Sequence, residues 1–390
     1  RTLVIAPESE QQRMVIESHT GPLELLDGRA NHNNGWYIVR TPVPAGAARG
    51  AVRWTVRPNV VPDWRYAPVV QVSQLGYAPD QPKRVVIEQD YRDRKASPLT
   101  LYRLTADGPE ALRTVTPQRW DGEFLRYAYL RYDFSDVREP GMYRFEYRGR
   151  ATQPFHIAAD VFARHAWQPT LEYYLPVQMC HVRVNEKYRA WHGLCHQDDA
   201  RMAPLDHNHF DGYVQESSTL TGFEPLDPVT GLNAGGWHDA GDYDLRVESQ
   251  IGTVWVLAQA VEEFGLKHDA TAIDPQRKLV EIHQPDGQSD ALQQIRHGLA
   301  SVLGGYRALG RLYRGIIVPT QRQYVLLGDA SVQTDNRVDD SAQARDDRWV
   351  FTEDNPNREL YVAGGLAAAA RVLRGFDDAL AAEALATAQA

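Results

Sequence analysis

A change in hydrophobic periodicity near residue 160 constrains the fold of this chain more than any other feature of the sequence. Before it, short runs of β-branched and aromatic residues lie between Gly, Pro and Asp, which is typical of β-strands. After it, apolar residues recur at intervals of three and four, which is typical of helices with one buried face. Because 390 residues exceed what one hydrophobic core usually supports, we expect a multidomain protein, β-rich first and all-α second.

The β-rich part is predicted to contain two pieces. Residues 1–68 read as the tail of a β-rich module, and residues 69–159 have about the length of an immunoglobulin-like β-sandwich. The predicted strands include Val52–Val56, Val69–Val72, Arg84–Ile87, Phe124–Leu130 and Met142–Tyr147.

The helical domain is predicted over residues 160–390. Long loops are expected at 197–236 and 315–356, and loops of that length are usually functional. The pairs Gly304–Gly305 and Gly364–Gly365 lie inside helical patterns, which indicates close helix packing and not phosphate binding. The helical stripes consist of Val247, Ile251, Val254, Leu257, Ala258, Val261 and Phe264, then Leu292, Ile295, Leu299, Val302 and Leu303, then Leu360, Leu366, Ala370 and Leu373.

The charge balance argues against two classes of partner. Lys and Arg number 42 against 51 Asp and Glu, which gives a net charge of −9, and no long basic run offsets it. A nucleic-acid or anionic-membrane partner is therefore disfavoured. The most apolar run, Ile251–Val261, is too short to span a bilayer, so we expect a soluble protein.

Both ends of the sequence suggest a fragment. Arg1 is not an initiator methionine, and no basic-then-apolar signal segment follows it. The last residues, Ala379–Ala390, form a strong helix pattern without a Gly, Asn or Pro to end it.

The segment Gly235–Tyr243 is the most informative one for chemistry. Asp239 and Asp242 are separated by Ala240 and Gly241, so a tight turn could direct both carboxylates into one space. One carboxylate could then take a proton from water while the other orients that water. The alternative is that either aspartate caps the helix that is expected to begin near residue 244.

A second constellation consists of Cys180, Cys195, His196 and His238. Two thiols and two imidazoles are what a closed tetrahedral zinc site requires. The alternatives are a disulfide, or buried thiols with unrelated histidines, because the gap from His196 to His238 is not a zinc-finger spacing. Further candidate ligands nearby are His181, His192, His207 and His209.

Two acidic loops are polar enough to bind a cation such as Ca²⁺. One contains Asp198, Asp199 and the stretch 206–211, and the other runs from 335 to 347. Neither has EF-hand spacing, so solvated loops are the favoured interpretation. A serine hydrolase gains no support, because the sequence contains no G-x-S-x-G elbow.

Several of these residues resemble glycoside hydrolase family 9, a group that includes many endoglucanases. Gly236–Asp242 resembles the family's DAGD motif. A second set of segments resembles the immunoglobulin-like domain that precedes many of these catalytic domains. These segments are Gln74–Pro79 with Lys83, Asp133–Ser135, Gly141–Tyr143 and Phe155–Ile157. The resemblance covers about residues 69–390, with the two motifs in the family's order.

The resemblance implies an (α/α)6 barrel after a β-sandwich, with only about the first half of the barrel in this chain. It implies hydrolysis of β-1,4-glycosidic bonds of cellulose or a related β-glucan with inversion. Asp242 matches the general base, and Asp239 matches the carboxylate that helps to hold the water. In relatives with His before DAGD, a structural zinc is bound by residues that match Cys180, Cys195, His196 and His238. A metal on His238 would fix the backbone beside Asp239.

Two departures from the family pattern affect the function. No residue here matches the general acid, since Glu353 and Glu359 lack the family's context, so we expect that glutamate beyond residue 390 or on a separate chain. The long stretch 197–235 is an insertion that could close one end of a cleft and favour an exo-cleaved or decorated glucan.

The leading hypothesis is therefore a secreted or periplasmic β-glucanase with structural zinc. The alternatives are an inactive carbohydrate-binding or scaffold fragment and an exo-acting glucosidase or glucosaminidase of the same family. A zinc hydrolase is the weakest, because four protein ligands would leave no position for a metal-bound water.

Overall fold

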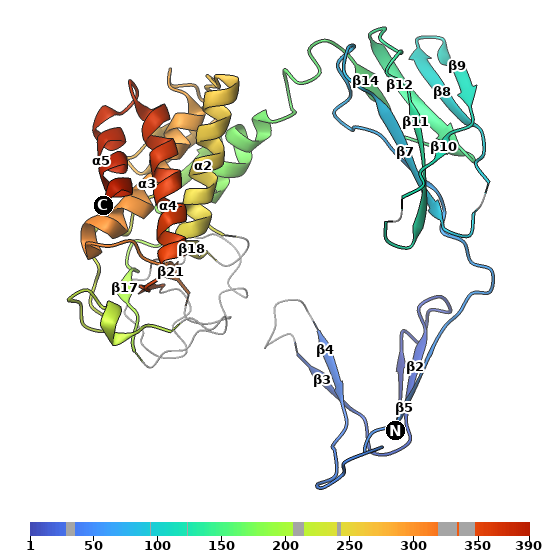
Figure 1. Cartoon of the computed structure of the whole chain (residues 1–390), viewed down its shortest axis with the longest axis horizontal. Coiled ribbons are helices and arrows are strands. Elements are labelled where there is room, and N and C mark those ends of the chain that lie inside the picture. Colours follow the sequence, from blue (N-terminus) through green and yellow to red (C-terminus); the bar gives the residue numbers. More distant parts are fainter. Residues whose placement is uncertain are drawn as a thin grey trace. The chain divides into compact units, whose positions relative to one another are not determined.

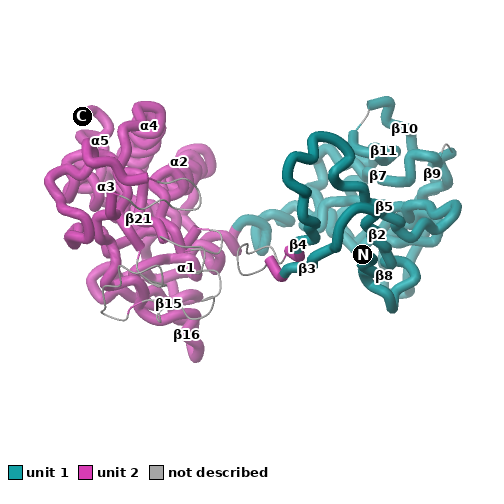
Figure 2. The backbone as a smooth tube through the Cα atoms, turned by 90° about the horizontal axis from the view of Figure 1, so that it is seen from below, with its two compact units in different colours: residues 1–26, 38–167 teal, residues 27–37, 168–390 magenta. Residues whose placement is uncertain are grey.

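We describe a computed structural model of the 390-residue chain. It covers residues 1–28, 36–93, 95–122, 124–205, 214–239, 243–318, 334 and 348–390. The chain divides into two compact units, one of residues 1–26 and 38–167 and the other of residues 27–37 and 168–390 (Figure 2).

The first strands form a small antiparallel sheet in the order β1-β2-β5 and a separate pair, β3-β4. Their bounds are Thr2–Ile5 (β1), Met14–Ser18 (β2), Glu24–Asp27 (β3), Tyr37–Arg40 (β4) and Trp54–Pro58 (β5). Ile16 is a buried hydrophobic side chain of this region, whereas Trp36, Tyr37 and Trp64 are more than half exposed. The described residues of this region form short strands, and few of their apolar side chains are buried.

The next nine strands form two antiparallel sheets. One has the order β10-β11-β7-β6, and the other has the order β13-β12-β8-β9, with β14 paired to β12. The bounds are Val69–Gln71 (β6), Arg84–Asp90 (β7), Leu99–Thr105 (β8), Gly108–Val115 (β9), Gln118–Arg119 (β10), Tyr127–Asp133 (β11), Gly141–Tyr147 (β12), Arg150–Ala151 (β13) and Phe155–Ile157 (β14).

Strand alternation explains the core of these two sheets. Along β7, Val85 and Ile87 are fully buried while Arg84 is exposed, because successive side chains of a strand point to opposite faces. The interior is rich in aromatic rings, and the Phe134 and Phe145 centroids lie 5.0 Å apart edge-on. The four runs predicted in this region correspond to β6, β7, β11 and β12.

A buried lysine ties one end of these sheets together. Lys83 is fully buried, and its Nζ donates to the carbonyl oxygens of Pro79 (2.6 Å) and Gln81 (2.9 Å). Its backbone N–H donates to Ser135 Oγ at 2.8 Å, so these motif segments lie side by side.

The second unit contains the helices. These are a π-helical turn at Thr170–Tyr174 (η1), a 3₁₀ turn at Ser217–Thr219 (η2), and Leu175–Gln178 (α1), Val247–Phe264 (α2), Asp290–Leu309 (α3), Pro356–Leu373 (α4) and Asp378–Gln389 (α5). Helix α2 packs against α3 and α4, and α4 packs against α5 (Figure 1). The predicted stripes are buried except at a few ends, where Phe264 and Leu360 are 78% and 73% exposed.

The glycine pairs serve helix packing, as predicted. A Cβ at Gly365 of α4 would lie 2.4 Å from the Ile251 side chain of α2. A Cβ at Gly304 of α3 would lie 2.8 Å from the Gly231 carbonyl oxygen. Each pair therefore lets a helix approach its neighbour more closely than a side chain would permit.

The prediction of an all-α second domain is wrong. The unit also holds two four-stranded sheets, in the orders β16-β15-β20-β19 and β17-β22-β21-β18. Their strands are Arg183–Glu186 (β15), Arg189–His192 (β16), Arg201–Met202 (β17), Leu245–Arg246 (β18), Thr271–Asp274 (β19), Leu279–Ile282 (β20), Gly315–Ile317 (β21) and Trp349–Phe351 (β22). Strands of two to four residues are too short to show an alternating pattern, and several of them, such as β17 with β22, pair only with distant segments. Strand β18 also moves the start of α2 from the expected residue 244 to Val247.

None of the helices in the described part of the chain is both long enough and apolar enough to cross a bilayer.

Candidate functional site

Four side chains that are far apart in the sequence meet in the second unit. They are Cys180, Cys195, His196 and His238, and their ligand atoms all lie within 4.8 Å of one another. The two sulfur atoms are 3.9 Å apart, Cys180 Sγ is 3.5 Å from His196 Nδ1, and Cys195 Sγ is 3.7 Å from His238 Nε2. Both cysteines are fully buried. The structure thus brings together all four residues of the predicted set, which we call the Cys/His cluster.

The spacing of the Cys/His cluster fits a tetrahedral zinc ion. Zinc–sulfur bonds of about 2.3 Å and zinc–nitrogen bonds of about 2.0–2.1 Å place two sulfur ligands about 3.8 Å apart and a sulfur and a nitrogen about 3.6 Å apart. The three distances above agree with these values. Cys180 and Cys195 are free thiols, so the disulfide alternative is not realised here. The cluster could therefore hold a metal ion, and no second such group of His, Cys, Asp and Glu occurs among the described residues.

The two short segments that carry Cys180 and His238 pair their backbones. The N–H of Cys180 donates to the Gly236 carbonyl oxygen, and the N–H of His238 donates to the Gln178 carbonyl oxygen, both at 2.8 Å. An antiparallel bridge joins Met179 to Trp237 between them. These bonds place Cys180 and His238 at opposite ends of one paired stretch.

Glycines allow this stretch to lie directly on α3. Gly235 has φ +72°, and a Cβ there would lie 2.3 Å from the His297 carbonyl oxygen. A Cβ at Gly298 would lie 2.3 Å from the Trp237 indole. The indole Nε1 donates to Gln294 Oε1 at 2.8 Å, and Trp237 is 5% exposed. Trp237 is therefore a core anchor and does not offer a stacking face to a sugar.

A buried histidine also holds the motif from α3. His297 Nε2 donates to the Gly236 carbonyl oxygen at 2.8 Å. Burial lowers the pKa of His297 to about 4, so the ring is neutral at neutral pH.

Asp239 is partly exposed and lies at the edge of the cluster. Its Oδ2 accepts a hydrogen bond from Ser249 Oγ of α2 at 3.1 Å, and its N–H donates to the Asp244 carbonyl oxygen at 3.2 Å. The helix-cap alternative is wrong for Asp239, because the N-cap of α2 is Arg246. Asp242 lies outside the described residues, together with Ala240 and Gly241.

Arg348 was not predicted as a site residue, and Asp199 was considered only as part of an acidic loop that could bind a cation. Arg348 is fully buried, and its Nε donates to Asp199 Oδ2. The guanidinium also reaches Tyr243, Cys180 and His181. Burial opposes ionisation, but the neighbouring Asp199 and thiol charges raise the pKa of Arg348 above its usual value, so it is charged. No spacing in the sequence links Arg348 to Asp199, so only the structure reveals the pair.

This pair corrects the prediction for the first acidic loop. Asp199 is 4% exposed and ion-paired, whereas the sequence favoured a solvated carboxylate. Its partner is a guanidinium, so Asp199 is not a free calcium ligand. Residues 206–211 and 335–347, and with them His207 and His209, lie outside the described part of the chain.

The other candidate histidines have different roles. The Nδ1 of His181 donates to the Gly235 carbonyl oxygen at 2.8 Å, and burial lowers the pKa of the ring. His192 packs beside His238 with ring centroids 5.8 Å apart and is not a member of the cluster.

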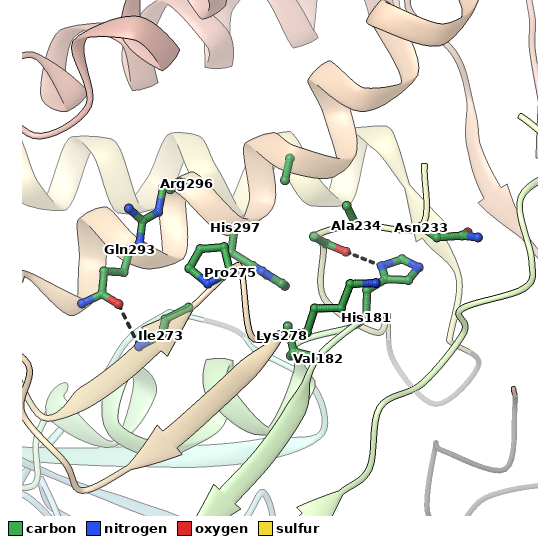
Figure 3. A pocket seen from close by; sticks show the side chains of 12 residues that line it. His181, Val182, Asn233, Ala234, Ile273, Pro275, Lys278, Gln293, Arg296 and His297 are labelled. Carbon is green, nitrogen blue, oxygen red and sulfur yellow. Dashed lines mark hydrogen bonds between the residues drawn. The ribbon is translucent and has the colours of Figure 1, made fainter. Parts of the chain in front are cut away.

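A small cavity lies beside Asn233–Gly235, the residues that directly precede the segment 236–243 (Figure 3). Its volume is about 140 Å³, and it lies between α3 and the β19–β20 hairpin. The cavity shares His181 and Gly235 with the surroundings of the cluster, and Lys278 and Arg296 also line it. Asp239 does not line this cavity, so it is not the space into which that carboxylate points.

Comparisons with protein families match both units. Residues 166–390 match the model of glycosyl hydrolase family 9, and residues 65–152 match that of the cellulase N-terminal ig-like domain. Among curated proteins, Endoglucanase D of Acetivibrio thermocellus is 24% identical over 220 residues, which are 55% of this chain and 31% of that protein.

Solved structures show the same fold. A metagenome-derived glycoside hydrolase family 9 endoglucanase superposes with a TM-score of 0.57 at 24% identity, over 83% of this chain and 53% of that chain. A Bacteroides ovatus GH9 protein gives a TM-score of 0.56 at 17% identity, over 82% of this chain and 52% of that chain. A Zn-binding triple mutant of the family 9 endoglucanase J30 gives a TM-score of 0.55 at 18% identity, over 80% of this chain and 51% of that chain.

The chain spans about half the length of these solved structures and about a third of Endoglucanase D. The family 9 match nevertheless covers more than half of this chain and contains the whole Cys/His cluster together with Asp239. The chain therefore belongs to glycosyl hydrolase family 9 and carries an immunoglobulin-like domain ahead of the family domain.

Proposed function

We propose that this protein is a glycoside hydrolase that cleaves β-1,4-glycosidic bonds of cellulose or a related β-glucan by single displacement with inversion. The observation that carries the proposal is the anchoring of the aspartate-bearing segment 236–243. Backbone bonds to residues 178–180 and a contact with α3 hold the segment at its start. A rigid support is what a catalytic carboxylate requires, because small displacements are costly in rate.

In this mechanism Asp242 acts as the general base. Its carboxylate would take a proton from the water that attacks the anomeric carbon, while Asp239 holds that water. Asp239 fits a holding role because it is partly exposed and one of its oxygens is fixed by Ser249 Oγ. The other oxygen of Asp239 is then available to accept a hydrogen bond from the water.

An inverting hydrolase also needs a general acid about 6.5–9.5 Å from the base. We propose that this glutamate belongs to the part of the family 9 domain that these 390 residues do not cover, since solved relatives are about twice as long. Helices α2–α5 would then be part of an (α/α)6 barrel over the proposed domain 160–390. The immunoglobulin-like domain would span 69–159, after a β-rich module of residues 1–68.

We propose zinc as the resident metal, with a structural role. Cys180, Cys195, His196 through Nδ1 and His238 through Nε2 would hold it. Four protein ligands fill a tetrahedral shell, so the metal would supply a fixed point and not an activated water. His238 directly precedes Asp239, so fixing the histidine also fixes the backbone of the aspartate.

The substrate of such an enzyme is a polymer found outside cells, so we also propose that the protein is secreted or periplasmic. A zinc-filled cluster would protect both thiols from oxidation in such a compartment.

The test uses the full-length protein, cellulose and soluble β-1,4-glucans, with ¹H NMR of the first products. Inversion predicts that the α-anomer forms first. Asp242→Asn should lower kcat by about 10²–10⁴-fold. The matched control is Asp107→Asn, which changes an exposed carboxylate in a turn of the β-sandwich and should leave kcat unchanged. First formation of the β-anomer would exclude inversion, and an active Asp242→Asn variant would exclude Asp242 as the base.

A further inference from the structure

We propose that Arg348 is a positioning residue that fixes the far end of the aspartate-bearing segment to the Cys/His cluster. The inference rests on the proposed roles of Asp239 and Asp242. It differs from them because Arg348 lies in another part of the chain and would act through the backbone at Tyr243.

The segment has two ends, and the Cys/His cluster takes one of its members only from the first. His238, at the start, belongs to the cluster. Tyr243, at the end, has φ +55°, a backbone conformation that non-glycine residues rarely adopt without support from their surroundings. Its carbonyl oxygen accepts a hydrogen bond of 2.7 Å from Arg348 Nη1.

The ring of Tyr243 contacts the cluster as well. Its centroid lies 4.8 Å from that of His238 and 5.3 Å from that of His196. The aromatic side chain and the carbonyl of one residue thus contact two different supports. A shift of Tyr243 would move the chain that leads directly to Asp242.

Arg348 joins this carbonyl to three further groups. Its Nε donates to Asp199, and its Nη2 lies 3.6 Å from Cys180 Sγ and 3.2 Å from His181 Nε2. His181 uses Nδ1–H to bond Gly235, so its Nε2 is left as the acceptor for Arg348. All three guanidinium nitrogens are therefore engaged, which is a geometry that a lysine ammonium cannot reproduce.

The chemistry of the pair favours positioning over simple stabilisation. Arg348 and Asp199 are both buried, and replacing such an ion pair with apolar side chains is often neutral for stability. The pair does, however, fix the relative positions of three segments, around residues 180, 199 and 243. A displacement of about 1 Å at a reacting group can cost about 10²-fold in rate.

The contact with Cys180 provides a second readout that does not depend on activity. An N–H directed at a thiolate stabilises its lone pairs, so a thiolate-to-metal charge-transfer band shifts to higher energy. Loss of the Arg348 contact should therefore move this band to longer wavelength when Co²⁺ occupies the cluster.

The experiment compares three forms of the full-length protein with the wild type. Arg348→Lys keeps the positive charge and removes the planar guanidinium with its several N–H donors. The double variant Arg348→Met with Asp199→Leu removes both charges and avoids a buried unpaired one. The control is Arg307→Lys, whose side chain forms an exposed ion pair with Glu383 on the far helix α5. Metal content, kcat and KM on a soluble β-glucan, and the Co²⁺ spectrum are measured for each form.

We expect both Arg348 forms to bind one metal per chain, to lose about 10- to 100-fold in kcat with KM changed less than about threefold, and to show the shift in the band. The control should match the wild type. Wild-type kcat in Arg348→Lys and in the double variant would overturn the proposal, as would an unshifted band. If the double variant does not fold, kcat and the Co²⁺ band of Arg348→Lys alone test the proposal. A wild type that hydrolyses no glucan would instead refute the proposed function.

Discussion

Among the described residues, each unit completely buries one cationic side chain, Lys83 or Arg348, and the two side chains find their hydrogen-bond partners in different ways. Lys83 in the β-sandwich donates to backbone carbonyls of Pro79 and Gln81, which lie within four residues of it in the sequence. Arg348 in the family 9 unit bonds to groups around residues 180, 199 and 243. The first cation closes a local turn, whereas the second joins segments that the sequence separates by more than 100 residues. A buried charge with local partners stabilises one loop, and a buried charge with distant partners fixes the geometry of a site.

The largest effect should come from separating the long-range pair. Asp199→Ala leaves Arg348 buried without its counter-ion, which should lower the free energy of unfolding of the second unit by about 3–5 kcal/mol. Peptide-resolved hydrogen exchange should show faster exchange in residues 168–390 and unchanged exchange in the sandwich. Equal acceleration in both units would show that they do not unfold independently.

The second unit should also lose stability in acid through His297, whose contribution to the free energy of unfolding should reach about 3 kcal/mol. Burial lowers the folded-state pKa of His297 to about 4, against about 6.5 when unfolded. The unfolded state therefore binds more protons between these values, so this contribution to stability is complete above pH 6.5 and is lost as the pH falls toward 4.

The variant His297→Gln isolates that contribution. Asp290 has its pKa raised to about 7 by burial, which favours the folded state as the pH falls, and this opposite effect is present in both proteins. The difference in unfolding free energy between wild type and variant should therefore shrink from pH 7 to pH 4. A difference that is constant with pH would show that His297 is already protonated or accessible.

The local cation should matter less than the distant pair. Lys83→Met leaves the carbonyl oxygens of Pro79 and Gln81 without this donor, which should cost about 1–3 kcal/mol. The loss should be confined to the sandwich in a denaturation experiment, with metal content and kcat unchanged. A change in either of those would show that the turn at Lys83 supports the second unit.

The contrast between the two cations also explains what the sequence could predict. Several strands of the sandwich, such as β7 and β12, and the helices α2, α3 and α4 follow from local periodicity, whereas Lys83 was singled out by the family resemblance. The four members of the Cys/His cluster were proposed because two thiols and two imidazoles suit zinc, and the family resemblance selected them from the other nearby histidines. Asp199 was predicted as a solvated carboxylate, because nothing nearby in the chain reveals that Arg348 reaches it. The strands β15–β22 were not predicted, because each is only two to four residues long and several have distant partners, such as β17 with β22.

The smallest effect should come from a cation that is not buried. Arg307 of α3 forms a bidentate ion pair with Glu383 of α5, at 2.5 and 2.6 Å, but its side chain is 54% exposed. Water and salt screen such a pair, so Arg307→Met should change the free energy of unfolding by less than about 1 kcal/mol. Urea denaturation at low and high salt measures this, and the small difference should vanish at high salt. A loss as large as that of Asp199→Ala would mean that the number of bonds, and not burial, sets the contribution of an arginine in this fold. The distinction drawn between Arg348 and the surface pairs depends on that comparison.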